Sequence, residues 1–114
     1  MAVGLGAKFE TDYLYGLSER ESNLLLSDTT KSDPYRFFNI DYYMHQKDDP
    51  RGEYGSIPYV TGHSTGNDAS LLWLNSSDTW TELIKTADEK AFTNFVSESG
   101  VLELFIFASK SPKT

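Results

Sequence analysis

The stretch Val101-Leu102-Glu103-Leu104-Phe105-Ile106-Phe107 is the strongest strand-forming segment of the sequence. Successive side chains of a strand point to opposite faces of the sheet, so the stretch divides into two sets. The fully apolar set is Leu102, Leu104 and Ile106. The second set is Val101, Glu103, Phe105 and Phe107, and its glutamate predicts partial exposure of that face. The preceding Glu98-Ser99-Gly100 predicts a hairpin turn.

Shorter runs of aromatic, aliphatic and β-branched residues occur along the rest of the chain and predict further strands. They cover residues 13–16, 35–40, 56–61 and 70–75. Pro58 indicates an edge strand or a bulge, whereas the continuous apolar run from 70 to 75 is typical of a strand covered on both faces. Residues 45–54 and 62–68 are polar or rich in glycine and are predicted to be loops.

Residues 79–95 fit two alternatives. Thr79-x-x-Glu82 matches a capping box, and Leu83, Ala87, Ala91 and Phe95 follow at helical spacing. The other reading is a pair of strands, 79–84 and 92–96, joined by the polar residues 88–90. We favour two strands. The chain then holds six or seven strands and little helix, which predicts an all-β antiparallel sandwich.

Composition excludes several classes of function. The 114 residues carry a formal net charge of −7, with 17 acidic and 10 basic side chains. Phosphate backbones are bound by Lys and Arg, so nucleic acid and anionic membrane surfaces are not expected as partners. There is no cysteine, which excludes disulfides and thiolate metal sites. Residues 1–8 do not read as a signal peptide, and no segment is long enough to span a bilayer.

Several motifs, in order, resemble family 31 glycoside hydrolases. Tyr15-Gly16-Leu17-Ser18-Glu19 is similar to the family's Y-G-x-x-E segment. The other four are residues 33–41, similar to D-P-Y-R-x-x-N-x-D; 54–58, similar to Y-G-S-x-P; 73–80, similar to W-L-N-A-x-E-T-W; and 97–100, Ser-Glu-Ser-Gly. The closest resemblance is to glucosidase II α-subunits. Two features depart from the pattern: Arg20 stands where many members have His, and the segment between Trp80 and Ser97 is short.

The resemblance implies an amino-terminal, galactose-mutarotase-like domain, a fragment of a supersandwich that packs beside a (β/α)8 barrel. Residues 1–108 would form the sandwich, and 109–114 would begin the connection to the missing barrel. A complete barrel takes about 250 residues, so none fits in this chain.

The same resemblance implies a parent enzyme that is a retaining α-glucosidase. Retaining enzymes use two carboxyl groups about 5 Å apart, and in this family both come from the barrel. The nucleophile motif W-x-D-M-N-E is absent here, so no catalytic residue is assigned to the chain. No cofactor is expected.

The resemblance implies that two residues of this chain contact the substrate. A loop of this domain reaches over the barrel mouth in the family, and its aspartate, which matches Asp41, binds hydroxyls of the non-reducing-end glucose. A carboxylate suits that task because charged acceptors form strong hydrogen bonds. Tyr43 falls near a second contact position. Without the family, Asp41 reads as a strand-end or turn residue.

Other candidates have simpler explanations. Trp73 and Trp80 could stack on sugars, but we expect both to be structural. His45 and His63 read as exposed loop histidines whose spacing matches no zinc signature. The acids around Asp48 lack the spacing of a calcium loop, so no metal site is predicted. Glu19-Arg20-Glu21 reads as a solvated cluster or a local ion pair.

Asn75-Ser76-Ser77 is a sequon, which makes Asn75 a candidate for N-glycosylation. Occupancy would require the secretory pathway, and the resemblance implies the endoplasmic reticulum lumen for the parent. The expected function is glucose trimming from an oligosaccharide or N-glycan, with the chain shaping the active-site entrance and a glucosidase II β-subunit as a partner of the parent. The alternative is a stand-alone sandwich that binds carbohydrate without hydrolysing it.

Overall fold

The computed structural model describes residues 1–37, 39, 41, 43–44, 47–49, 51–75 and 77–111, which contain eight β-strands and no helix. The strands are β1 (Val3–Phe9), β2 (Leu14–Gly16), β3 (Tyr35–Arg36), β4 (Tyr59–Ser64), β5 (Asn67–Leu74), β6 (Thr79–Lys85), β7 (Ala91–Ser97) and β8 (Glu103–Ser109). Within this described part, no helix could cross a membrane.

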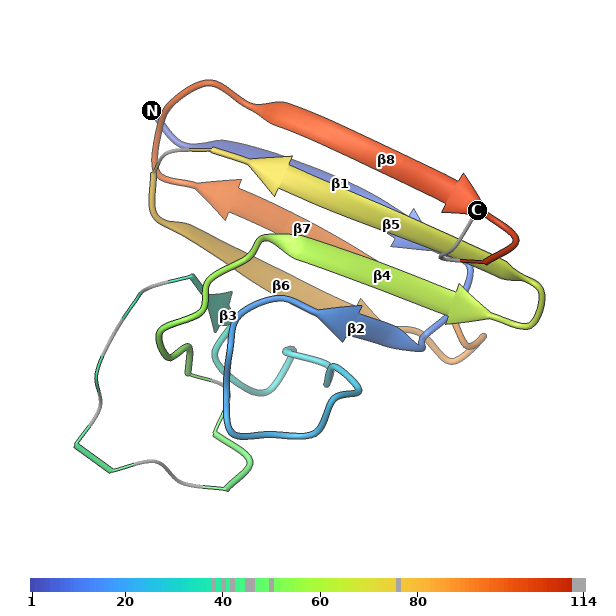
Figure 1. The fold of residues 1–114 in the computed structure, drawn as a ribbon, viewed down its shortest axis with the longest axis horizontal. Coiled ribbons are helices and arrows are strands. Elements are labelled where there is room, and N and C mark those ends of the chain that lie inside the picture. The colour runs from blue at the N-terminus through green and yellow to red at the C-terminus, as the bar shows by residue number, and fades with distance from the viewer. Residues whose placement is uncertain are drawn as a thin grey trace.

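The strands form two four-stranded sheets that lie face to face (Figure 1). The first sheet has the order β1-β7-β6-β3 and the second β2-β4-β5-β8. Every pair of neighbouring strands is antiparallel. The predicted all-β antiparallel sandwich is therefore confirmed.

The ambiguous segment 79–95 forms two strands, as favoured. β6 and β7 pair over their full length, and Thr79, Thr81 and Leu83 are buried at alternate positions of β6. Because Thr81 and Thr93 face the interior with no exposed surface, burial with period two overrides the helical spacing seen in the sequence.

Two predictions were wrong, one strand was not anticipated, and one predicted strand is recovered only in part. Residues 62–68 are not a loop, because β4 and β5 continue through them and leave only Thr65 and Gly66 as the turn, with Gly66 at φ 82°. The turn at 98–100 does not join a hairpin, because β7 and β8 belong to different sheets.

β1 was not anticipated, since Gly4 and Gly6 weaken its strand pattern. Of the predicted strand 35–40, β3 contains only Tyr35 and Arg36, while Phe38 and Ile40 lie outside the described residues.

The core is organised around Trp73, which is fully buried, as expected for a structural tryptophan. Trp73 lies on β5 in the second sheet, and its ring stacks on Phe95 of β7 in the first sheet, with centroids 5.7 Å apart. Its Nε1 donates to Ser97 Oγ at 2.8 Å, and Ser97 Oγ lies 2.6 Å from Thr79 Oγ1. A single side chain thus joins the two sheets by packing and by a satisfied buried polar contact.

We predict that Trp73→Phe lowers the free energy of unfolding by about 2 kcal/mol, because it removes a buried hydrogen bond and leaves a cavity. Trp80→Phe is the matched control. Trp80 is half-buried on β6, and its replacement should change the free energy by less than about 1 kcal/mol. Urea unfolding measures both, and equal effects would refute the central role of Trp73.

Candidate functional site

The segment between β3 and β4 carries the predicted substrate-binding residues and extends away from the two sheets (Figure 1). Asp41 is exposed and Tyr43 is fully exposed, at 100%. Neither side chain is committed to the core. The arrangement therefore presents one carboxylate and one aromatic ring to solvent on the same loop.

Tyr54, farther along the same segment, is the residue that meets Asp41. A hydrogen bond to the Asp41 carboxylate is the largest cause of a raised pKa for Tyr54, and desolvation and the charges of Asp41, Glu53 and Glu19 act in the same direction. The phenol therefore stays protonated and serves as the donor to Asp41. This contact brings together two motifs that are separated in the sequence.

The base of the loop is held by Glu19. The backbone N–H of Glu53 donates to Glu19 O at 2.9 Å, and the N–H of Glu19 donates to Gly55 O at 2.7 Å. The Glu19 carboxylate also accepts from the N–H of Gly55 at 2.8 Å. A Cβ on Gly55 would lie 3.2 Å from Glu19 Cβ, so the close approach favours glycine. These contacts fix the chain on both sides of Tyr54.

Arg20 joins backbone carbonyls before and after it in the segment that contains Glu19. Its Nη1 donates to Gly16 O at 2.8 Å and Ser18 O at 3.0 Å, and its Nη2 donates to Asn23 O at 3.1 Å. The guanidinium lies 5.2 Å from the ring centroid of Tyr35 on β3. Desolvation lowers the pKa of Arg20, which nevertheless stays charged because an arginine is not deprotonated in proteins. The prediction of a solvated side chain is therefore wrong for Arg20. This residue is half-buried, and it binds backbone carbonyls of the segment.

The chemistry of this site suits a neutral, hydroxyl-rich ligand. The Asp41 carboxylate can accept from adjacent hydroxyls, which form strong bonds to a charged acceptor, and the exposed ring of Tyr43 offers a flat apolar face. The nearby acids Glu19 and Glu53 disfavour anions. No group of three or more potential metal ligands occurs among the residues that the structure describes.

Asn75, the candidate glycosylation residue, lies in the turn between β5 and β6. Its Oδ1 accepts from the N–H of Ser77 at 2.7 Å, and its Nδ2 donates to Val101 O at 3.1 Å. The side chain thus joins this turn to the segment before β8. Ser76, the middle residue of the sequon, lies outside the described residues.

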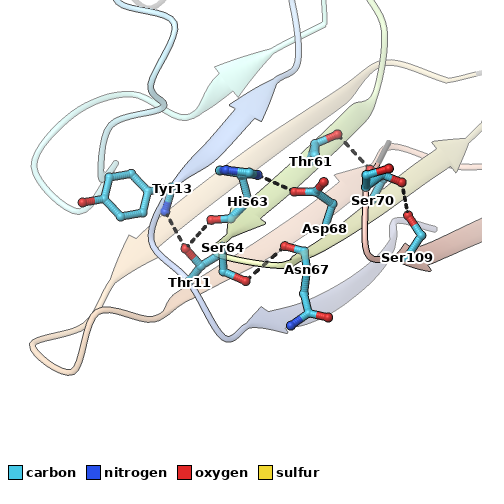
Figure 2. Close-up of polar contacts among 10 residues, drawn as sticks. Thr11, Tyr13, Thr61, His63, Ser64, Asn67, Asp68, Ser70 and Ser109 are labelled. Atoms are coloured by element: carbon cyan, nitrogen blue, oxygen red, sulfur yellow. Dashed lines mark hydrogen bonds and ion pairs between the residues drawn. The ribbon is translucent and has the colours of Figure 1, made fainter. Parts of the chain in front are cut away.

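The far end of β4 carries a second polar group, shown in Figure 2. His63 Nδ1 contacts the carboxylate of Asp68 on the paired strand, and Thr11 Oγ1 donates to His63 O at 2.9 Å. The His63 side chain is 61% exposed, as predicted, but it lies on a strand rather than in a loop. These contacts hold the β4–β5 turn and its neighbouring segment together. His45 lies outside the described residues.

Three residues of the candidate site escaped sequence reasoning: Tyr54, Glu19 and Arg20. Tyr54 and Glu19 stand within motifs that carried the family resemblance, but no local pattern showed that these motifs meet in space. The flanking acids of Arg20 indicated an ion pair, whereas backbone carbonyls bind it. These roles become clear only from the contact in space between the segment that contains Glu19 and the segment that contains Tyr54.

The sequence model of the glycosyl hydrolase 31 N-terminal galactose mutarotase-like domain matches residues 2–82. A curated relative, glucosidase 2 subunit alpha of Schizosaccharomyces pombe, is 37% identical over 118 residues, which cover 93% of this chain and 13% of the relative. The curated relatives are named as glucosidases, among them neutral alpha-glucosidases of mammals.

Solved structures agree with these matches. A glucosidase II alpha subunit in its alpha3-Glc2-bound form superposes with a TM-score of 0.88 at 28% identity, covering 98% of this chain and 14% of that chain. The same values hold for an ER glucosidase II heterodimeric complex of the catalytic subunit and the binding domain of the regulatory subunit. The chain thus spans about one seventh of the length of these relatives.

We predict that Asp41→Asn lowers the pKa of Tyr54 towards its ordinary value, because the acceptor loses its charge. An NMR titration of the tyrosine ring carbons measures this shift, with Asp33→Asn as a control because Asp33 is exposed and does not contribute to the Tyr54 pKa.

The raised pKa of Tyr54 makes the stability of the fold depend on pH, and thermodynamic linkage gives the direction. Because folding raises the Tyr54 pKa, its contribution to stability is complete below the unfolded-state pKa and is lost as the pH rises through the folded-state value. Equal titration of Tyr54 in both variants would contradict the contact with Asp41.

Proposed function

The chain belongs to the glycosyl hydrolase 31 family, as its N-terminal galactose mutarotase-like domain, and from this premise we propose that it is the non-catalytic sandwich of an α-glucosidase. In this proposal the sandwich forms one wall of the active-site entrance, and the bond is cleaved on a (β/α)8 barrel elsewhere in the parent polypeptide. Residues 1–108 would be the sandwich and 109–114 the start of the connection. β8 ends at Ser109, one residue beyond the proposed end of the sandwich.

The absence of the nucleophile motif from these residues supports a non-catalytic role. Glycoside hydrolysis with retention needs a nucleophile and an acid/base carboxyl group about 5 Å apart. The sequence contains no W-x-D-M-N-E, and a barrel of about 250 residues exceeds the chain. We assign no catalytic residue to it.

The loop with Asp41 and Tyr43 carries the proposal of substrate contact. Both side chains are exposed on a segment whose base is fixed by Glu19. A fixed base positions an exposed carboxylate at lower entropic cost than a free loop would. Asp41 would accept hydrogen bonds from hydroxyls of the terminal glucose, and Tyr43 would form a second contact with the substrate.

The names of the relatives support the substrate and partner classes. One solved relative is a glucosidase II alpha subunit bound to alpha3-Glc2, and another is an ER glucosidase II heterodimeric complex of the catalytic subunit and the binding domain of the regulatory subunit. We therefore propose a glucose-terminated oligosaccharide or N-glycan as substrate, a regulatory β-subunit as partner, and the endoplasmic reticulum lumen as the place of action of the parent.

Asp41→Asn, made in the polypeptide that joins this chain to its barrel, tests the proposal. Loss of a charged hydrogen bond costs about 1.5–3 kcal/mol, so kcat/KM for an α1,3-linked glucosyl disaccharide should fall by about 10- to 150-fold. Asp33→Asn, a control at an exposed aspartate that precedes β3, should leave kcat/KM unchanged. Equal kinetics in both variants would overturn the role of Asp41.

The 114-residue chain by itself separates the proposal from its alternative. It should release no glucose, and calorimetric titration with the same disaccharide should show no binding at micromolar affinity. Tight sugar binding by the chain alone would instead identify a stand-alone carbohydrate-binding sandwich.

We also propose that Asn75 carries an N-glycan when the chain passes through the secretory pathway. Asn75-Ser76-Ser77 is the only sequon of the sequence. The Asn75 amide contacts the carbonyl of Val101, which is an exposed residue. Mass spectrometry of secreted protein should show a peptide-N-glycosidase-sensitive mass increase that Ser77→Ala abolishes. An unmodified wild-type chain would refute this.

A further inference from the structure

The chain that follows β2 runs beside the chain that precedes β4, so the pairing of these two strands continues beyond the sheet. β2 and β4 pair antiparallel within the second sheet. Beyond them, the N–H of Leu17 donates to Tyr59 O at 2.8 Å, and the N–H of Glu19 donates to Gly55 O at 2.7 Å. The end of the β3–β4 segment that enters β4 is therefore anchored to the second sheet.

Tyr54 is held on both sides by this anchor. The N–H of Glu53 donates to Glu19 O at 2.9 Å, and the N–H of Gly55 donates to the Glu19 carboxylate at 2.8 Å. Because the allowed rotamers of a side chain depend on its backbone torsions, fixing both neighbours restricts the directions that the Tyr54 ring can take. A tyrosine also has only two side-chain torsions, so little entropy is lost when its hydroxyl is held in place.

The hydroxyl of Tyr54 donates a hydrogen bond to the carboxylate of Asp41. Asp41 lies on the part of the segment that leaves β3, and Tyr54 lies on the part that returns to β4, so the contact joins the two parts. An ionised carboxylate has about four acceptor positions on its two oxygens. One donor can therefore orient Asp41 and still leave acceptor positions for hydroxyls of a ligand.

The contact matters more to a ligand than to the fold. Tyr54 is 59% exposed, and substitutions at such surface positions usually change stability little. Binding, in contrast, depends on how much torsional freedom the acceptor must lose when the ligand arrives, and a carboxylate that is already held loses less. The exposed hydroxyl of Tyr54 is thus better suited to positioning Asp41 than to stabilising the core.

We propose that Tyr54 is a positioning residue that holds the Asp41 carboxylate in the orientation in which it binds hydroxyls of the terminal glucose. The inference rests on the proposed function, because it takes the sugar contact of Asp41 as its premise. Tyr54 acts through Asp41 and is assigned no contact with the sugar. Glu19 acts one step farther away, by fixing the backbone on both sides of Tyr54.

Tyr54→Phe, made in the polypeptide that joins this chain to its barrel, removes the donor and keeps the ring. Loss of one hydrogen bond should lower kcat/KM for an α1,3-linked glucosyl disaccharide by about three- to tenfold, while the temperature of unfolding stays the same. Tyr13→Phe is the matched control, because Tyr13 is 55% exposed and precedes β2. It should leave kcat/KM unchanged.

A double-mutant cycle with Asp41→Ala distinguishes positioning from a general structural role. In the Asp41→Ala protein, Tyr54→Phe should lower kcat/KM by less than about twofold, because no carboxylate is left to orient. An equal loss in both backgrounds, or no loss from Tyr54→Phe alone, would refute the inference while the proposed function stands. If Asp41→Ala itself leaves kcat/KM unchanged, the proposed function fails and this inference fails with it.

Discussion

The two sheets of this sandwich depend on one contact across the interior. The side chain of Trp73 projects from the second sheet into the interior. Its ring stacks on Phe95 and its Nε1 donates to Ser97 Oγ, and both partners belong to the first sheet. An aromatic ring contributes a large buried area, and its N–H finds an acceptor that is already bonded to Thr79. This contact sets β5 of the second sheet against β7 of the first. The loop with Asp41 connects the same two sheets, because it runs from β3 of the first sheet to β4 of the second.

Much of the fold could be predicted from the sequence, because burial in a sheet leaves a period of two. That period is clear in β8, and Trp73 was expected in the core from the apolar run around it. It is weak in β1, where two glycines interrupt it, and at Asp68 and Ser70, which are polar yet buried. The change of sheet after Gly100 could not be predicted, since the same turn residues suit a hairpin and a connection between sheets.

The candidate site was predictable only in part. Asp41 was predicted from its place in a family motif and Tyr43 from its position two residues later, and the structure adds that both are exposed. The supporting contacts are long-range: Glu19 and Gly55 are 36 residues apart, and no local pattern reports such a meeting. Arg20 was misread because its neighbours in sequence are acidic, whereas its neighbours in space are carbonyl oxygens and the ring of Tyr35. The same backbone thus forms a core around Trp73 and a loop whose base is fixed by Glu19.

In the function proposed above, the Asp41 carboxylate of this sandwich binds a sugar while another domain of the parent polypeptide cleaves the glycosidic bond. A structure of the parent polypeptide with a bound α1,3-linked glucosyl disaccharide tests it most directly. We expect an Asp41 carboxylate oxygen within about 3 Å of a hydroxyl of the terminal glucose, and no carboxylate of this chain in position to act as nucleophile or acid/base at the scissile bond. A sugar bound away from Asp41, or a catalytic pair supplied by these residues, would contradict it.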